Sequence, residues 1–259
     1  AVTISDTSAS AANIKLINAD STGAIDMSAV TTITSSSTSD VLEIVNNTNA
    51  AFTTANNYAV TLNDTASAAN ANIIMNDTAG IVTATVTATG VVADLNTALA
   101  NATANDALTL VLNATSASAA DLNTLNGKTS VNINAATIET ITSSTADDVN
   151  TAVTNKTAIG LDGDWDVTLS DTTLSAAEVK TINAATSGTI NMAAATTISS
   201  SSISDILEIV NNTGAAFTTH ADYAVTISDT SASAANIKLI NADSLSLIHI
   251  SEPTRRRGI

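Results

Sequence analysis

Three aspartates at alternate positions form the densest acidic group in the chain. They are Asp162, Asp164 and Asp166, within the segment LDGDWD at 161–166. Carboxylate oxygens are the hard ligands that Ca²⁺ takes, and the spacing matches the start of a twelve-residue calcium loop. The match then ends, because Val167 stands at the glycine position and Thr173 at the final glutamate position. The sequence leaves two interpretations open, a calcium site or an acidic turn before a strand.

A second aspartate position recurs after successive predicted strands. Its members are Asp6, Asp64, Asp171 and Asp229. We expect these side chains to cap their own turns, as aspartate commonly does. The alternative is that cations or helix N-termini offset their mutual repulsion.

The remaining side chains offer little for catalysis. The chain has no cysteine, and His220 is the only histidine before residue 245. A zinc site is therefore excluded, and a Ser-His-Asp triad has no support where Ser and Asp are so common. A polysaccharide-acting enzyme would need aspartates grouped with basic residues, whereas the lysines are isolated in the sequence. Alternating threonines in VTATVTAT at 82–89 would share one strand face, as in ice-binding proteins, but other repeats lack this pattern.

The charge balance is strongly acidic. The chain carries 24 acidic and 8 basic residues, a formal charge of −16. A nucleic-acid partner would require a basic stripe, so we expect none. An acidic surface suits solubility at high salt or the binding of divalent cations. No run of about 18 apolar residues is present, so no membrane-spanning helix is predicted.

The last residues differ from the rest of the chain. The segment LSLIHISEPTR at 245–255 resembles the translation of an adapter used in DNA library preparation, and all three arginines and the single proline lie in 245–259. We interpret 245–259 as a non-native tail and exclude it from the fold. The chain also begins within a repeat, so we expect it to be a fragment.

The chain before this tail is a tandem array. Residues 1–21 return letter for letter at 224–244, and variants begin near residues 59, 107 and 166. We therefore divide residues 1–244 into units near 1–58, 59–106, 107–165 and 166–223, with a partial unit at 224–244. Each unit holds two coils, and each coil combines short strands with one short helix.

Capping signals place the helices. The first helix of each unit begins at a serine, and a complete capping box is present only at Ser175 with Glu178. The second helix begins near Asp40 and Asp205, and helices end at asparagines such as Asn46 and Asn211. We also expect positive φ at four glycines, Gly23, Gly80, Gly127 and Gly188. The aromatic residues Tyr58, Trp165 and Tyr223 are expected to lie in surface turns. A stacked aromatic column is the alternative.

Strands that alternate with helices predict a parallel sheet covered by helices. With only 2% aromatic and 12% charged residues, the core must consist of aliphatic side chains. The predicted fold is an α/β repeat solenoid with short parallel strands and short capped helices. The alternative is an all-β solenoid in which the capped segments are turns.

The pattern VTLSDTTLSAAEVKTINAATSGTINMAAATTI at 167–198 resembles the repeats of giant bacterial surface proteins, including cyanobacterial cell-surface proteins and secreted adhesins. The resemblance implies an extracellular, non-enzymatic structural or adhesive role, with neighbouring repeats and surface polysaccharide or protein as partners. The alternative hypothesis is a calcium-dependent binding module of a secreted adhesin. No cofactor is expected apart from possible calcium.

Overall fold

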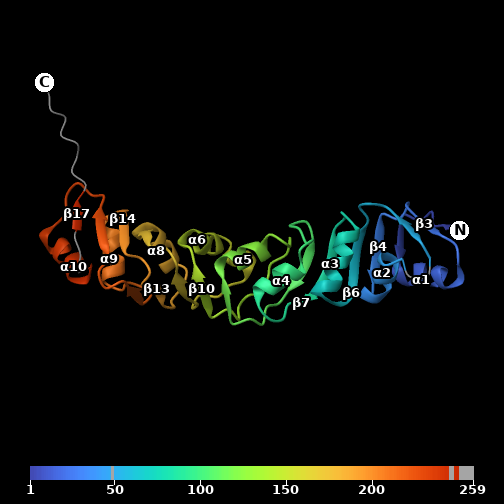
Figure 1. The fold of residues 1–259 in the computed structure, drawn as a ribbon, viewed down its shortest axis with the longest axis horizontal. Helices are drawn as coiled ribbons and strands as arrows, with labels where there is room; N and C mark the ends of the chain where they lie inside the picture. The colour runs from blue at the N-terminus through green and yellow to red at the C-terminus, as the bar shows by residue number, and fades with distance from the viewer. Residues whose placement is uncertain (48–49, 245–247, 251–259) are drawn as a thin grey trace, which may run out of the picture. The chain divides into compact units, whose positions relative to one another are not determined.

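Figure 1 shows the computed structural model of the chain, which describes residues 1–47 and 50–244 and the backbone of 248–250. Excluding the whole tail from the fold was wrong at 248–250, which form a strand that pairs with the strand at Ala224–Ile227. The rest of the predicted tail at 245–259 lies outside the described residues. The fold is α/β, with short helices between short strands.

The helices confirm the predicted mixture of elements and exclude the all-β alternative. Within the described residues they are α1 (Ala11–Asp20), α2 (Thr38–Val45), α3 (Ala68–Asp77), α4 (Val92–Ala98), α5 (Ala119–Asn126), α6 (Ala146–Thr154), α7 (Lys156–Ile159), α8 (Ala176–Asn183), α9 (Ile203–Val210) and α10 (Ala234–Ser244).

The strands are short, and the strand at Ala59–Ser67, with 9 residues, is longer than the other described strands. The described strands are β1 (Val2–Thr3), β2 (Ser8–Ser10), β3 (Ile25–Met27), β4 (Thr32–Ser36), β5 (Phe52–Thr54), β6 (Ala59–Ser67), β7 (Val82–Thr87), β8 (Ala107–Leu110), β9 (Ser116–Ser118), β10 (Thr140–Ser144), β11 (Asp166–Leu169), β12 (Thr173–Ser175), β13 (Ile190–Met192), β14 (Thr197–Ser201), β15 (Phe217–Thr219), β16 (Ala224–Ile227) and β17 (Ile248–Ile250).

The described strands pair in parallel throughout. The sheet orders are β1-β3-β5, β2-β4-β6-β7-β8, β15-β13-β11-β10-β9 and β12-β14-β16-β17. Parallel neighbours require a crossover, and here a helix supplies most of the crossovers. The strands β2, β9 and β12 were not predicted; each lies directly before a helix, where the sequence indicated only a turn.

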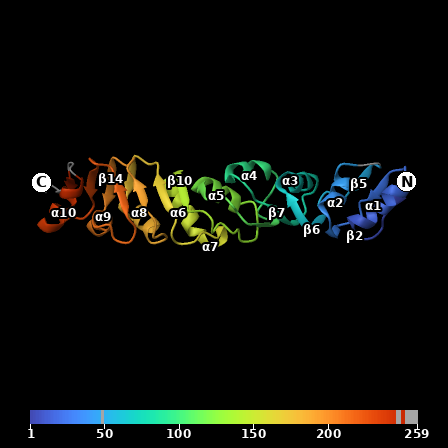
Figure 2. The same cartoon turned by 90° about the horizontal axis from the view of Figure 1, so that it is seen from below.

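The chain divides into two units by its contacts. The first comprises Ala1–Ala114, Thr124–Ala135 and Thr157–Gly160, and the second comprises Thr115–Asn123, Ala136–Lys156 and Leu161–Ile259. In the first unit, α1, α2, α3 and α4 contact one another in sequence, and α1 to α3 pack on strands β2, β4, β6 and β7 (Figure 1). In the second unit, α6, α8, α9 and α10 contact one another in sequence, and α8 packs on β12 and β14 (Figure 2).

Three of the first helices, α1, α5 and α8, are capped from two sides. The predicted N-cap Ser175 accepts the backbone N–H of Glu178 and completes the capping box. In addition, the buried Ser201 on β14 accepts the first helical N–H, that of Ala176, at 2.9 Å. Ser36 and Ser144 do the same for α1 and α5, at 2.8 and 2.9 Å. A helix start that is buried without such partners would leave orphan donors, so these serines bind each strand to the preceding helix.

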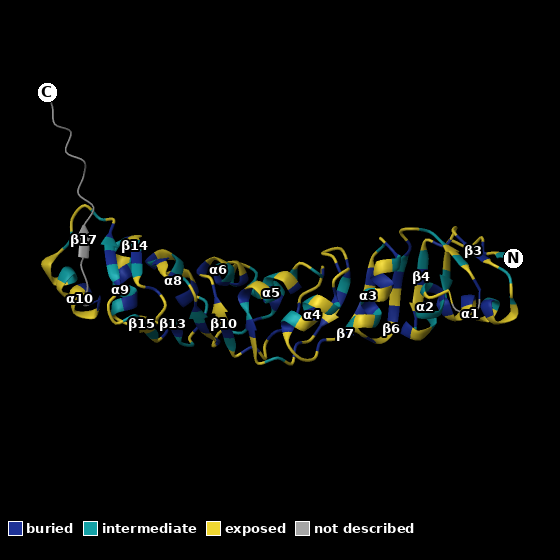
Figure 3. Cartoon of the chain, in the orientation of Figure 1, coloured by how far each residue is buried: buried dark blue, intermediate teal, exposed yellow. Residues whose placement is uncertain are grey.

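The predicted surface position of the three aromatic residues is wrong. Tyr58, Trp165 and Tyr223 are 0%, 0% and 1% exposed and are the largest fully buried side chains. In Figure 3 buried and exposed residues alternate along the strands and helices. With so few aromatic residues, each large ring fills core volume that the surrounding Ala, Val and Ile leave free.

The glycine prediction is also wrong, for a steric reason. Positive φ occurs at Gly90, Gly160 and Gly214 rather than at the four predicted positions. At Gly80 a Cβ would lie 2.3 Å from the carbonyl oxygen of Tyr58, and at Gly188 it would lie 2.3 Å from that of Trp165. These glycines allow close backbone approach, which is the other reason for glycine in a strand-to-loop position.

Among the second helices, α2 and α9 begin earlier than predicted and end at the predicted asparagines, whereas α4 ends at Ala98 with Leu99 as its C-cap. Ser37 and Ser202 are the N-caps of α2 and α9, so Asp40 and Asp205 lie inside the first turn. Asn46 and Asn211 are the C-caps. The next residues, Asn47 and Asn212, have positive φ and accept the N–H groups of the phenylalanines at 52 and 217 with their side chains.

Candidate functional site

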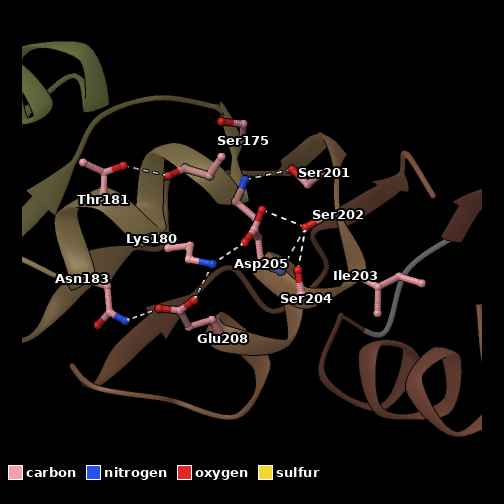
Figure 4. A network of polar contacts seen from close by, with 12 residues as sticks. Ser175, Lys180, Thr181, Asn183, Ser201, Ser202, Ile203, Ser204, Asp205 and Glu208 are labelled. Atoms are coloured by element: carbon pink, nitrogen blue, oxygen red, sulfur yellow. Dashed lines mark hydrogen bonds and ion pairs between the residues drawn. The ribbon is translucent and has the colours of Figure 1, made fainter.

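The best-organised polar group in the second unit joins α8 to α9. We call Lys180, Asn183, Asp205 and Glu208 the Lys180 cluster (Figure 4). Lys180 Nζ lies 2.7 Å from Asp205 Oδ1 and 3.5 Å from Glu208 Oε2. The Asn183 amide donates to Glu208 Oε1 at 3.0 Å and to the carbonyl oxygen of Thr213 at 2.7 Å. The cluster therefore connects two helices and the loop that follows them.

Helical spacing places these side chains. Lys180 and Asn183 are three residues apart on α8, and Asp205 and Glu208 are three apart on α9, so each pair shares one helix face. Asp205 also accepts a 2.7 Å hydrogen bond from the N-cap Ser202. A carboxylate in the first turn of a helix is favoured by the helix dipole.

The electrostatics of the cluster favour permanent charge. The hydrogen bond from Lys180 and its charge lower the pKa of Asp205, and the Asp205 carboxylate raises the pKa of Lys180. The pKa of Asp205 is lowered and the pKa of Lys180 is raised, so both pKa values move away from neutral pH. A general acid or base instead needs a pKa near the working pH. The arrangement therefore has the properties of an ion pair that holds elements together.

The same cluster occurs in the first unit. Lys15 Nζ lies 2.9 Å from Asp40 and 3.4 Å from Glu43, and the Asn18 amide donates to Glu43 at 2.9 Å. In both copies the lysine and its aspartate are 25 residues apart. Sequence reasoning treated the lysines as isolated and missed both clusters; the repeated separation of 25 residues was the signal that could have revealed them.

The predicted acidic site is only partly assembled. Asp162 is half-buried, and Asp164 and Asp166 are exposed. Burial and the neighbouring Asp164 carboxylate raise the pKa of Asp162, and its Oδ1 is buried without a hydrogen-bond partner. Asp166 instead accepts the backbone N–H of Thr189 at 2.6 Å. Nowhere in the described residues do three acidic or histidine side chains gather as a metal ligand group.

The recurring aspartates have a different partner from the one predicted. Asp64, Asp171 and Asp229 accept first-turn N–H groups of α2, α6 and α9, at 2.9, 2.8 and 2.6 Å. Each carboxylate thus lies at the N-terminus of the helix before it in the chain, where the helix dipole favours negative charge. These contacts match the alternative in which helix N-termini offset the repulsion between the aspartates, and not the expectation that each aspartate caps its own turn.

The other predicted candidates lie on the surface. The Nδ1 of His220 accepts the N–H of Asp222 at 3.1 Å, which is a contact within one turn. The threonines at 83, 85 and 87 are exposed on β7, as the alternation predicted. Thr85 pairs in register with Thr65 and Thr109 on the neighbouring strands.

The first unit also contains an open polar hollow of about 520 Å³. Asparagines, threonines and the carboxylates of Asp77 and Asp106 line it. Both carboxylates are engaged: Asp77 accepts the Tyr58 hydroxyl at 2.5 Å, and Asp106 accepts the N–H groups of Val82 and Thr103. The hollow therefore presents mainly uncharged polar groups.

Comparisons with protein-family models, with curated proteins and with solved structures found no match to this chain. In the part of the chain that the structure describes, no helix has the length and apolar character needed to cross a membrane.

Proposed function

We propose that the chain is a non-enzymatic structural or adhesive repeat segment of a large extracellular bacterial surface protein. In this proposal residues 1–244 form an α/β repeat solenoid that acts as a spacer or a binding surface. Its partners are neighbouring repeats and, at the cell surface, polysaccharide or protein. The extracellular location rests on the resemblance of the repeats to bacterial surface proteins.

The observation that carries the proposal is the use of polar residues between successive helices. The two lysine clusters, the serines that cap the preceding helix and the aspartates at helix N-termini all make contacts to the neighbouring strand–helix segment. Their hydrogen-bonding capacity is used to join segments, which is the role expected in a repeat protein whose stability comes from nearest-neighbour interfaces. The pKa shifts in both clusters lead away from acid–base catalysis.

Small-angle X-ray scattering of the full chain tests the solenoid. A compact protein of this length has a radius of gyration of about 18 Å. Helices that stack about 9 Å apart along one axis would instead give a radius of roughly 25 Å. A value near 18 Å with a globular distance distribution would refute the spacer.

A calcium-dependent binding module is the second candidate. It is supported by the Asp162 carboxylate, whose Oδ1 is buried without a partner beside the Asp164 carboxylate. Such a group would gain from a divalent cation, because two neighbouring carboxylates repel each other. Thermal melts in EDTA and in millimolar calcium test this candidate, with the double variant Asp162→Asn, Asp164→Asn as the control. A calcium-dependent rise in Tm that the double variant lacks would support a site; equal melts would reject it.

A further inference from the structure

The open polar hollow of the first unit has the size of a ligand site. Its volume of about 520 Å³ lies within the roughly 300–1,000 Å³ that small-molecule sites occupy. The end of α3 and the loop after it, at 75–80, form one wall, and residues of the connection from α4 to β8, at 101–106, form the other. Asn56 completes the lining. All of these residues belong to the first unit, so the hollow is complete within it.

One wall is a connection that differs from its counterparts. Residues 99–106 are all described, and they run from α4 to β8 without a strand. The connections after α2 and α9 contain β5 and β15. Because the backbone here has no strand alternation to turn every second side chain inward, Asn101, Thr103 and Asn105 are all exposed along the hollow. These side chains are therefore not needed for the packing of strands.

Both walls are fixed by buried hydrogen bonds. Asp106, which is 5% exposed, accepts the N–H of Val82 at 2.9 Å and the N–H of Thr103 at 2.8 Å. In the other wall Thr78, which is 6% exposed, donates its hydroxyl to the carbonyl oxygen of Tyr58 at 2.6 Å. A site that is held in this way loses little conformational entropy when a ligand binds.

Three asparagine side chains present unused hydrogen-bonding groups. Asn56, Asn76 and Asn105 line the hollow and are exposed, and within the described residues none of their side-chain amides has a hydrogen-bond partner. Each amide offers two donors and one acceptor. Met75, which is 6% exposed, adds an apolar group to the lining. The hollow therefore suits a ligand that both donates and accepts hydrogen bonds and also has some apolar surface.

The charges around the hollow disfavour ionic ligands. Among its described lining residues none is lysine or arginine, and two, Asp77 and Asp106, are acidic, so an anion would be repelled. A metal cation is also disfavoured, because both carboxylates already accept hydrogen bonds and the described residues contain no group of three metal-binding side chains. A neutral polar ligand fits best.

We propose that the hollow binds a segment of a neutral saccharide. A sugar hydroxyl both donates and accepts, so two neighbouring hydroxyls can form two hydrogen bonds with one asparagine amide. The C–H groups of the sugar ring would contact Met75. An extended peptide would instead pair with a free strand edge, which these loops do not provide. The inference rests on the proposed function and deepens it, because it selects polysaccharide as the surface partner and gives it a site.

Titration of the ¹⁵N-labelled full chain with maltohexaose, cellohexaose and laminarihexaose tests the proposal. We expect at least one of these neutral probes to bind with a Kd of about 1 mM or tighter. The backbone amides that shift should be those of 75–80 and 101–106. Hexagalacturonate, which carries a carboxylate on each ring, should bind more weakly than the best neutral probe. The proposal is overturned if no neutral probe gives saturable shifts, if the shifts lie elsewhere, or if hexagalacturonate binds as tightly.

A hexapeptide of alternating glycine and serine separates a saccharide site from a peptide site. This probe offers backbone amides and isolated hydroxyls, whereas a sugar ring offers neighbouring hydroxyl pairs. It should bind more weakly than the best neutral saccharide. Equal or tighter binding of the peptide would overturn the saccharide assignment.

Asparagine substitutions locate the contact. Asn76→Ala and Asn105→Ala remove exposed amides without a partner in the described chain, so each should weaken binding about fivefold and leave Tm unchanged. Asn13→Ala removes an exposed amide on α1, outside the hollow, and should leave the Kd unchanged. Ala79→Trp places a large side chain in the hollow and should abolish binding. An unchanged Kd in the folded Asn76→Ala, Asn105→Ala double variant would overturn the site.

The scattering experiment and the titrations can fail separately. An extended chain that binds no neutral probe keeps the proposed spacer and overturns the saccharide site. A compact chain that binds a neutral probe at the hollow refutes the spacer and keeps the saccharide site.

Discussion

Ser144 provides a direct test of how neighbouring segments are held together. Its side chain is 5% exposed, accepts the N–H of Ala119 at 2.9 Å and donates to the carbonyl oxygen of Thr142 at 2.7 Å. Ala119 is 0% exposed and begins α5, so no solvent can replace the lost acceptor. Ser144→Ala leaves this donor orphaned and weakens the solvation of the Thr142 carbonyl.

The expected cost follows from these two groups. An unsatisfied buried donor costs about 1–3 kcal/mol, and the weakened carbonyl adds a fraction of that. We therefore expect Ser144→Ala to lower the free energy of unfolding by about 2–3 kcal/mol in urea titrations. Ser143→Ala, at the adjacent exposed position, should change it by less than about 0.5 kcal/mol.

Hydrogen exchange supplies the local measurement for the same variant. The Ala119 amide should exchange about two orders of magnitude faster in Ser144→Ala than in the parent, because 1.4 kcal/mol corresponds to a factor of ten. Ser36→Ala and Ser201→Ala should act in the same way on α1 and α8. Equal stabilities of the Ser144 and Ser143 variants, with unchanged exchange at Ala119, would refute the capping role.

Three further experiments test the packing and the ion pairs. Gly188→Ala should destabilise the protein by about 2–4 kcal/mol in urea, because its Cβ would meet the Trp165 carbonyl at 2.3 Å, whereas Gly163→Ala, with only a lysine Nζ at 3.6 Å, should be nearly neutral. The buried Trp165 Nε1 has no hydrogen-bond partner. The pair Trp165→Tyr and Ala185→Asp recreates the Tyr223–Asp243 contact and should show a favourable coupling of about 1 kcal/mol in a double-mutant cycle. Zero coupling would contradict this prediction. Lys180→Met should lower the stability only slightly at neutral pH, because the lysine is exposed to solvent. Since Lys180 lowers the pKa of its aspartate partner in the folded state, this contribution should fade as the pH drops below about 4, and pH-independent loss in stability titrations would argue against the ion pair.

Local signals in the sequence predicted much of the fold. The serine N-caps of α1, α3 and α8, the capping box at Ser175 and the asparagine C-caps of α2 and α9 depend on contacts within a few residues, and the structure confirms them. By contrast, α1 and α3 continue past the predicted asparagines and have Ser21 and Thr78 as their C-caps. Alternation of apolar residues also predicted the strands, since it reports directly which face is buried. The calcium site at Asp162, the solenoid and the extracellular role stay predictions.

Contacts between distant residues were beyond such reasoning. The burial of Tyr58 and Trp165 depends on what packs around them, and the glycines at 80 and 188 are needed because another backbone passes close by. The lysine clusters likewise arise only when α8 and α9, or α1 and α2, lie side by side.

The two copies of residues 1–21 separate the contributions most clearly. The sequence by itself determined that both copies form a strand, a capped start and a helix, because these depend on local propensity and capping. Only the tertiary structure decided that Val2 is partly exposed while Val225 is buried, since burial depends on which neighbour lies against the segment. Local geometry follows from adjacent residues, whereas the faces available for binding follow from the packing of segments far apart in the chain.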